Sequence, residues 1–193
     1  MSKKANGFTI VELLIAIVVI GILAAISIVA YNNIQQRAKN SSTAQAVSQW
    51  VRILNMYKAD GGNFPTMTSC LGSSESYGHG ISGTDSSGPQ CRQDTSGGSG
   101  ISVNTTFMNQ MSPHIHGSGP SPAIVVFGTA GSYPWFRGAY YYPAYTGSAA
   151  RIDFVLQGAS ENCPDIGGAV RVTRAVHAAS NTIRCSASLE ETP

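Results

Sequence analysis

Residues 8–30 read FTIVELLIAIVVIGILAAISIVA, a run of 23 residues with one charged side chain, Glu12. As an α-helix this run would rise ~34 Å, which is enough to cross the apolar core of a bilayer. A carboxylate in that core is costly and usually marks a function. Glu12 lies close to the start of the helix, however, where a glutamate can stay near the lipid headgroups. The residues alone therefore predict a membrane-spanning helix and leave two interpretations of Glu12 open, a functional acid and a tolerated interfacial one.

The helical pattern continues beyond Ala30 into residues 31–60. A stripe at steps of three and four residues is flanked there by Trp50 and Tyr57 and consists of Ala44, Val47, Val51, Leu54 and Lys58. Such a stripe is typical of an amphipathic helix that packs on a globular head. Gly61 and Gly62 then end the helix. A helix from Phe8 to Asp60 would be ~80 Å long, which suits the core of a filament better than a single globular domain.

A short basic leader precedes the apolar run. It reads KKANG at residues 3–7, and FTIVELL at 8–14 and GILAAI at 21–26 follow it. A basic leader, a glycine, a phenylalanine and a glutamate four residues later resemble the processing motif of prepilins, the precursors of the type IV pilin superfamily. The resemblance is strong over the first 30 residues and weak over the rest of the stem. One departure is Val29, which stands where many Gram-negative members have a proline that kinks the helix.

The resemblance implies chemistry that is done to this chain rather than by it. A prepilin peptidase would cut between Gly7 and Phe8 on the cytoplasmic side and methylate the new amine, and the bare backbone of Gly7 would let the peptidase approach closely. During assembly, the Glu12 carboxylate would face the amine of Phe8 in a neighbouring copy, so that a costly charge gains a partner. The implied partners are further copies in a homopolymer, the peptidase, the assembly platform with its ATPase, and the membrane before assembly.

The N-terminal segment is also compatible with two different roles. A secretory signal peptide would be removed so that the mature chain begins near residue 28. A non-polymerising tether would keep Met1 and use the helix only to anchor a binding domain. The length of the apolar run, the embedded Glu12 and the continuation of the helical pattern past Ala30 argue against a signal peptide. The embedded Glu12 and the leader glycine argue against a tether.

The remaining chain predicts an antiparallel sheet, so the expected fold class is α+β, with the long helix packed on a C-terminal sheet head. Short segments at 123–127, 139–145, 151–156 and 170–176 predict strands, and 181–185 predicts a last edge strand. Ile152, Phe154 and Leu156 would form the buried face of a half-buried sheet. The expected domains are a leader at 1–7, a transmembrane and filament-core helix at 8–30, a stem helix at 31–60, and a head at 61–193 whose sheet occupies about 123–185.

Four cysteines, Cys70, Cys91, Cys163 and Cys185, occur without a C-x-x-C pair, which argues against structural zinc. Behind an export segment an even count favours disulfides, and three connectivities are possible. We favour Cys70 with Cys91 and Cys163 with Cys185, since each pair flanks one compact stretch. Closing loops of about 20 residues would contribute ~3 kcal/mol each. The first pair would staple residues 69–100, which contain 8 Gly and 9 Ser, as a surface loop.

Charge limits the classes of partner. The formal charge is +2, and loss of Lys3 and Lys4 with the leader would bring it to zero. Residues 61–193 carry six arginines against eight acids. This balance argues against a large phosphate-binding face, because affinity for nucleic acids comes from many basic contacts. Near-neutral charge also lowers the repulsion that opposes self-association.

No constellation of residues predicts an enzyme, a cofactor or a metal site. Glycines at 78, 80 and 83 match the dinucleotide fingerprint but lack a preceding strand and a following helix. His114 and His116 lie among prolines and glycines, which indicates an exposed loop. The aromatic stretch from Trp135 to Tyr145 resembles a platform for single-stranded DNA or sugars, but at strand spacing half of its rings should point into the core.

The resemblance therefore implies a structural subunit of a type IV pilus that serves adhesion, twitching motility or DNA uptake. The alternative within the superfamily is a minor pilin or a pseudopilin of a type II secretion or competence system. The expected location is a single pass through the cytoplasmic membrane before assembly and the cell surface afterwards.

Overall fold

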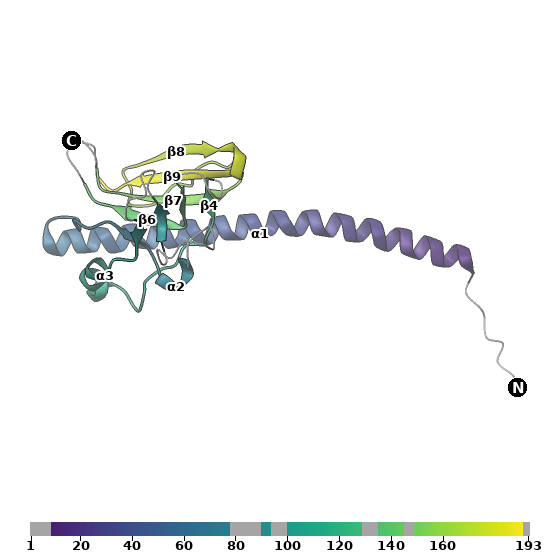
Figure 1. Ribbon diagram of the computed structural model, residues 1–193, viewed down its shortest axis with the longest axis horizontal. Helices are drawn as coiled ribbons and strands as arrows, with labels where there is room; N and C mark the ends of the chain where they lie inside the picture. Colours follow the sequence, from purple (N-terminus) through teal and green to yellow (C-terminus); the bar gives the residue numbers. More distant parts are fainter. Residues whose placement is uncertain (1–8, 78–89, 94–99, 129–134, 145–148, 191–193) are drawn as a thin grey trace, which may run out of the picture. The chain divides into compact units, whose positions relative to one another are not determined.

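The computed structural model describes residues 9–77, 90–93, 100–128, 135–144 and 149–190. The chain divides into two compact units, residues 1–38 and 39–193. The predicted long helix is confirmed: α1 runs from Ile10 to Gly61, through Gly21 and residue 29, without a break (Figure 1). Gly62 follows with a φ of +80° and donates its N–H to the Lys58 carbonyl at 2.7 Å. This left-handed conformation is the one that glycine commonly provides at a helix C-terminus.

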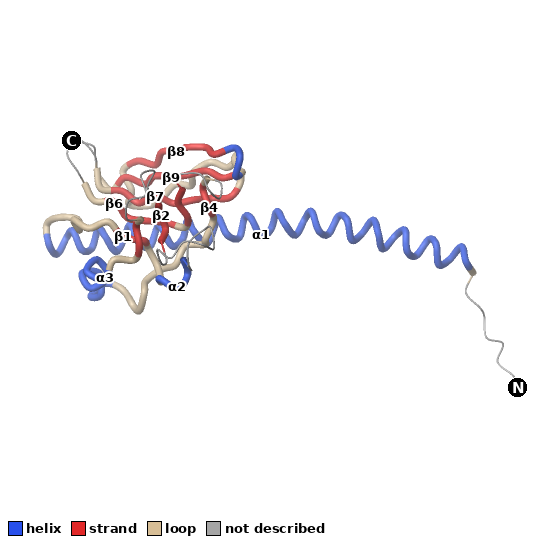
Figure 2. The backbone as a smooth tube through the Cα atoms, viewed as in Figure 1, coloured by secondary structure: helices blue, strands red, loops and turns tan. Residues whose placement is uncertain are grey.

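The described strands form two antiparallel sheets in the second unit (Figure 2). The first sheet has the order β1 (Ser69–Cys70), β6 (Ala139–Tyr142), β7 (Arg151–Gln157), β9 (Thr182–Ser188) and β8 (Arg171–His177). The second has the order β3 (Ile101–Ser102), β2 (Gln90–Gln93), β5 (Trp135–Arg137) and β4 (Val126–Phe127). The described part of the second unit also contains two short helices and two 3₁₀ turns. These are α2 (Ser74–Tyr77), α3 (Thr105–Met111), Ser112–His114 and Ala178–Ser180. The predicted α+β class is confirmed.

The main core lies between residues 46–54 of α1 and the inner face of the first sheet. Val47, Trp50, Val51 and Leu54 are completely buried there, and they belong to one cluster with Tyr141, Ile152, Phe154 and Ile183. Trp50 was expected beside the apolar stripe, but it lies at the centre of the buried face. Its indole Nε1 donates to the Pro120 carbonyl at 2.6 Å, so the one polar atom of the ring is satisfied.

The outer face of the first sheet is also partly covered, which the sequence did not predict. Tyr140 and Val155 pack there against Phe136 of β5 and the buried Cys70–Cys91 disulfide. The expectation that β7 is half-buried is therefore wrong, because Asp153 and Val155 are as buried as Ile152 and Phe154. The second sheet supplies the cover.

The expected edge strand is in fact interior. β9 pairs with β7 on one side and with β8 on the other, so β8 forms the edge of the first sheet (Figure 1). The turn between β8 and β9 lies at 178–181, where Asn181 adopts a left-handed conformation with a φ of 49°. Chain order alone does not reveal which strand of a hairpin lies inside the sheet and which forms its edge. Here the later strand, β9, is the inner one.

The strand predicted at 123–127 is shorter than expected, because only Val126 and Phe127 join the second sheet as β4. Ala123 lies outside it and donates its N–H to the Thr43 hydroxyl of α1 at 3.2 Å. A continuous apolar run is compatible with a strand and with a buried irregular segment. The composition of residues 123–127 therefore does not determine where the strand begins.

Asn40 of α1 replaces a missing strand at the end of β7. β6 begins at Ala139, which pairs with Phe154, so no residue of β6 lies opposite Gln157. The Asn40 amide donates to the Gln157 carbonyl and accepts from the Gln157 N–H, both at 2.9 Å. A buried or half-buried main-chain pair without partners would be costly, and the side chain of Asn40 removes that cost.

Candidate functional site

The processing site expected at Gly7 and Phe8 lies outside the described residues, which begin at Thr9. Glu12, which was expected to act in assembly together with Phe8, lies in the first turn of α1. The structure therefore places one of the three predicted residues and gives the geometry of its surroundings.

Thr9 and Glu12 form a reciprocal cap at the start of α1. The Thr9 N–H and hydroxyl donate to Glu12 Oε2 at 2.9 and 2.7 Å, and the Glu12 N–H donates to Thr9 Oγ1 at 3.3 Å. This is the capping-box pattern, in which the N-cap hydroxyl and an acid three residues later satisfy donors at the helix start. The T-x-x-E signal at residues 9–12 was present in the sequence, but Glu12 was interpreted by its charge alone. The carboxylate thus has a role within its own chain as well as a proposed one between chains.

The surface of α1 that follows Glu12 is apolar and exposed. The large aliphatic side chains between Ile10 and Ile28 are 48% to 78% exposed wherever they are described. None of the most apolar stretch of α1 is buried within the chain, and the helix is long and apolar enough to cross a membrane. Ser27 donates its hydroxyl to the Leu23 carbonyl at 2.7 Å, which satisfies its polar group without water. Such a surface requires lipid or other protein to cover it.

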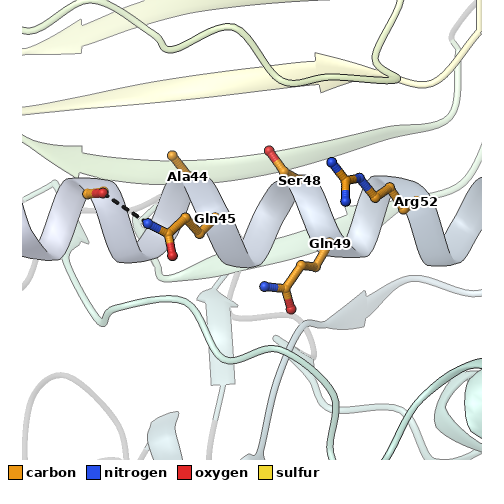
Figure 3. A pocket seen from close by; sticks show the side chains of 6 residues that line it. Ala44, Gln45, Ser48, Gln49 and Arg52 are labelled. Atoms are coloured by element: carbon orange, nitrogen blue, oxygen red, sulfur yellow. Dashed lines mark hydrogen bonds between the residues drawn. The ribbon is translucent and has the colours of Figure 1, made fainter.

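The part of α1 in the second unit has a polar face as well as a buried one (Figure 3). A shallow groove of about 330 Å³ runs along it and is lined by Ser41, Ala44, Gln45, Ser48, Gln49 and Arg52. Gln45 Nε2 donates to Ser41 Oγ at 3.3 Å. The groove contains no carboxylate, histidine or cysteine, so its residues offer hydrogen bonds and one positive charge but no general acid–base pair.

Both disulfides join the pairs that the sequence favoured. Cys70 is bonded to Cys91, and Cys163 to Cys185, across separations of 21 and 22 residues. The first pair was expected to staple a surface loop, yet both of its cysteines are completely buried and its ends belong to β1 and β2. The staple therefore links the two sheets. Residues 78–89, which carry the glycines of the fingerprint-like spacing, lie outside the described residues.

His114 and the aromatic stretch that the sequence singled out make contacts within the second unit. His114 Nε2 lies 3.5 Å from Asp60 Oδ2, and its ring packs edge-on against Tyr57. Within the described ranges there is no group of three or more His, Cys, Asp or Glu side chains that could hold a metal.

The aromatic stretch contributes to the core, because Phe136, Tyr140 and Tyr141 are buried. Burial raises the pKa of the Tyr140 hydroxyl well above its usual value, and so does the Asp153 carboxylate that accepts its hydrogen bond at 2.7 Å.

Comparison with known proteins adds two findings. The family model described as the prokaryotic N-terminal methylation motif matches residues 2–28. The chain is also similar to the type II secretion system core protein G of Dickeya chrysanthemi, at 32% identity over 75 residues, which cover 37% of this chain and 47% of that protein. The chain thus spans about half the length of this curated relative. No solved structure matched.

These findings agree with the geometry. The matched motif includes the capped start of α1 and the exposed apolar surface that follows it. The chain therefore carries the prokaryotic N-terminal methylation motif on a long apolar helix that antiparallel sheets follow, which is a pilin-like α+β architecture.

Proposed function

We propose that this chain is a structural subunit of a type IV pilus, held in the cytoplasmic membrane by its N-terminal helix and then polymerised through that helix. The observation that carries the proposal is the methylation motif on a helix whose apolar surface no described residue covers. Copies of the helix would cover that surface in a filament as lipid covers it before assembly. The role is structural rather than catalytic, and the filament would lie outside the cell.

Processing would use Gly7 and Phe8, and assembly would use Phe8 and Glu12. Prepilin peptidase would cut between Gly7 and Phe8 and methylate the new amine, leaving Glu12 at the fifth mature position. In the free subunit, Thr9 holds the Glu12 carboxylate at the helix start. In the filament the same carboxylate would also accept the amine of a neighbouring copy, and a carboxylate oxygen has room for more than one donor. The leader at 1–7, the membrane and filament-core helix at 8–30, the stem at 31–60 and the head at 61–193 are the corresponding division of the chain.

The head has properties that suit exposure outside the cell. Two disulfides close segments of the head, and such bonds persist in oxidising compartments. The polar groove from Ser41 to Arg52 offers a hydrogen-bonding surface to neighbouring copies. Adhesion, twitching motility and DNA uptake are the activities that such a filament would serve, through the machinery that extends and retracts it.

A second candidate is a pseudopilin of a type II secretion system, and the similarity to core protein G favours it. The two candidates share processing and polymerisation but differ in the assembly they build. Deletion of the gene should remove surface filaments in the first case and leave secreted proteins inside the envelope in the second. Bulk presence of this chain in a native filament preparation supports the pilus, and secretion failure with normal filaments supports the pseudopilin.

Mass measurement of the exported protein tests the processing step. A mature chain that begins at a methylated Phe8 supports the proposal. An intact Met1 would indicate a membrane tether instead, and a start beyond Ala25 would indicate cleavage by signal peptidase. Either of these two outcomes would overturn the proposal.

Substitution of Glu12 tests the assembly step. Glu12→Ala should be processed normally but should yield few filaments, because the amine of the neighbouring copy loses its carboxylate. Glu75→Ala is the matched control, since it removes the same side chain from an exposed position in α2 and should assemble normally. Normal filament yield from Glu12→Ala would contradict charge pairing as the basis of assembly.

A further inference from the structure

The outer face of the first sheet carries a row of side chains that the proposed assembly does not use. The strand register aligns Tyr142 of β6 with Arg151 of β7, Arg151 with Ser188 of β9, and Ser188 with Arg171 of β8. Residues that are directly paired in an antiparallel sheet lie on the same face. These four residues therefore form one cross-strand row, which we name the arginine strip.

A second row of small polar residues lies beside the arginine strip. Ser186 pairs with Thr173 of β8, two residues from Ser188 and Arg171 respectively. Alternate residues of a strand share a face, so these two hydroxyls lie next to the strip. Arg184 follows on the same face of β9 and stacks over Phe136 at 5.5 Å, which adds positive potential along the sheet.

The strip lies on the face away from α1. Ile152 and Ala187 alternate with the strip residues of β7 and β9 and are buried in the cluster that contains Trp50. The second sheet packs over Tyr140 and Val155. Arg171 and Thr173 stay exposed, and Arg151 keeps 29% of its side chain exposed. The strip is thus accessible from outside although the centre of the sheet is covered.

The charge of the strip is positive. Arg151 lies 4.6 Å over the Tyr142 ring and 3.3 Å from Asp153 Oδ1, which fixes its orientation. Asp153 is only 1% exposed and also accepts the Tyr140 hydroxyl, so it offsets part of the Arg151 charge but presents almost no carboxylate surface to solvent. None of the described carboxylates forms an ion pair with Arg171. Because one strand separates Arg151 from Arg171, their backbones lie about 10 Å apart.

We propose that the arginine strip binds a linear carboxylated polysaccharide, such as a polymer of uronic acid. The planar guanidinium matches a carboxylate with two parallel hydrogen bonds. The hydroxyls of Ser188, Ser186 and Thr173 lie between or beside the two arginines and can donate to and accept from sugar hydroxyls. A polymer of acidic sugars presents carboxylates and hydroxyls along one extended chain. The strip presents arginines and hydroxyls along one row, so the two are complementary.

Nucleic acid fits the same surface less well. Affinity for phosphates depends on many basic contacts, whereas residues 61–193 carry six arginines against eight acids. Single strands also need open aromatic faces for base stacking. Here the Tyr142 ring faces Arg151, and Tyr140 and Phe136 are buried.

The test uses the full-length protein in a non-ionic detergent, so it does not depend on filament assembly. Binding is measured to immobilised polygalacturonate and to its methyl ester, which has the same backbone without the charge. We expect binding to the acid form, loss of binding to the ester, and affinity about tenfold lower for Arg171→Ala, since a hydrogen-bonded charged contact is lost. Arg171→Lys, which keeps the charge without the fork, should lie between the two.

Arg174→Ala is the matched control. Arg174 lies on the same strand, but it pairs with Cys185 on the α1 side of the sheet and donates to the Ala159 carbonyl at 2.6 Å. Arg174→Ala removes the same charge as Arg171→Ala but should leave binding to polygalacturonate unchanged. Equal losses for the two variants, equal binding to the ester, or stronger capture of single-stranded DNA or of anionic lipid vesicles would each overturn the proposal. Matching thermal unfolding of the variants establishes that any loss comes from the surface and not from misfolding.

Discussion

The contact between Gly119 and Trp50 allows a quantitative test of how the head is packed on α1. Gly119 has a φ of +72°, and a Cβ placed on it would lie 2.7 Å from Trp50 Cζ2 and 3.0 Å from Cη2. Trp50 is completely buried, and its ring is fixed by the hydrogen bond to Pro120. Gly119→Ala therefore introduces two costs, a strained backbone and an overlap with a ring that has little room to move.

The two costs can be separated by a neighbouring glycine. Gly117 has a similar φ of +62°, but a Cβ there would meet nothing within 4 Å. Gly117→Ala should cost only the left-handed strain, about 1–2 kcal/mol. Gly119→Ala should add the overpacking of a core, about 1–3 kcal/mol. The difference between the two variants measures the contact with Trp50.

The assay is thermal unfolding of the oxidised full-length protein in detergent, followed by near-ultraviolet circular dichroism. For a domain of this size each kcal/mol shifts Tm by about 2–4 °C. Trp50→Phe provides the closing variant of a double-mutant cycle, because the smaller ring should make Gly119→Ala less costly. Equal Tm values for Gly119→Ala and Gly117→Ala would refute the inference that the loop at 119 is held against the indole.

Three further predictions concern the cap, the strand end and the buried hydroxyls. Thr9→Val deletes the hydroxyl that donates to Glu12 and accepts its N–H, so hydrogen exchange of the Glu12 amide in micelles should accelerate several-fold, and an unchanged rate would mean that the cap is not formed. Asn40→Ala removes both hydrogen bonds to Gln157 and should lower the free energy of unfolding by about 1–3 kcal/mol, measured by denaturant titration; a change within error would contradict its role as a strand substitute. Burial raises the pKa of Tyr140, so the unfolded chain loses that proton first and stability should fall above about pH 10, by up to ~1.4 kcal/mol per pH unit for this group. Tyr140→Phe should make the decline shallower between about pH 10 and 11, and an identical slope would exclude this hydroxyl as a cause.

The long helix could be predicted because its signals are local. An uninterrupted apolar run, a stripe at helical spacing and two terminal glycines each constrain the same segment, and α1 ends at Gly61. The pairs of cysteines were likewise favoured by short separations along the chain. Such features depend on neighbours in the sequence, which a single chain displays directly.

The arrangement of the strands could not be predicted, because it depends on distant neighbours. Asp153 looks like an outward residue in an alternating strand, yet it is buried because the second sheet covers it and Tyr140 satisfies it. The short strand β2 lies within a Gly- and Ser-rich segment whose composition indicates a loop. The position of β9 inside the sheet also follows from pairing with β7, which no local pattern records.

At the candidate site the prediction was uneven for the same reason. Glu12 was found from its charge, but its partner Thr9 required a capping argument that the apolar context obscured. The arginine strip is invisible in the sequence, because its members come from four strands and share a face only through the register.

The two disulfides also determine how the head would respond to a pulling force. Cys70–Cys91 and Cys163–Cys185 each close a segment within the head, and neither includes a residue of α1. A load applied along α1 would therefore reach the sheets through noncovalent packing and through the short connection after Gly61. While the bonds are intact, the segments between the paired cysteines cannot extend. The cysteines of the two pairs are 21 and 22 residues apart in the sequence. Reduction should lengthen the fully stretched chain by about 140 Å at about 3.3–3.6 Å per residue, a step that single-molecule stretching resolves.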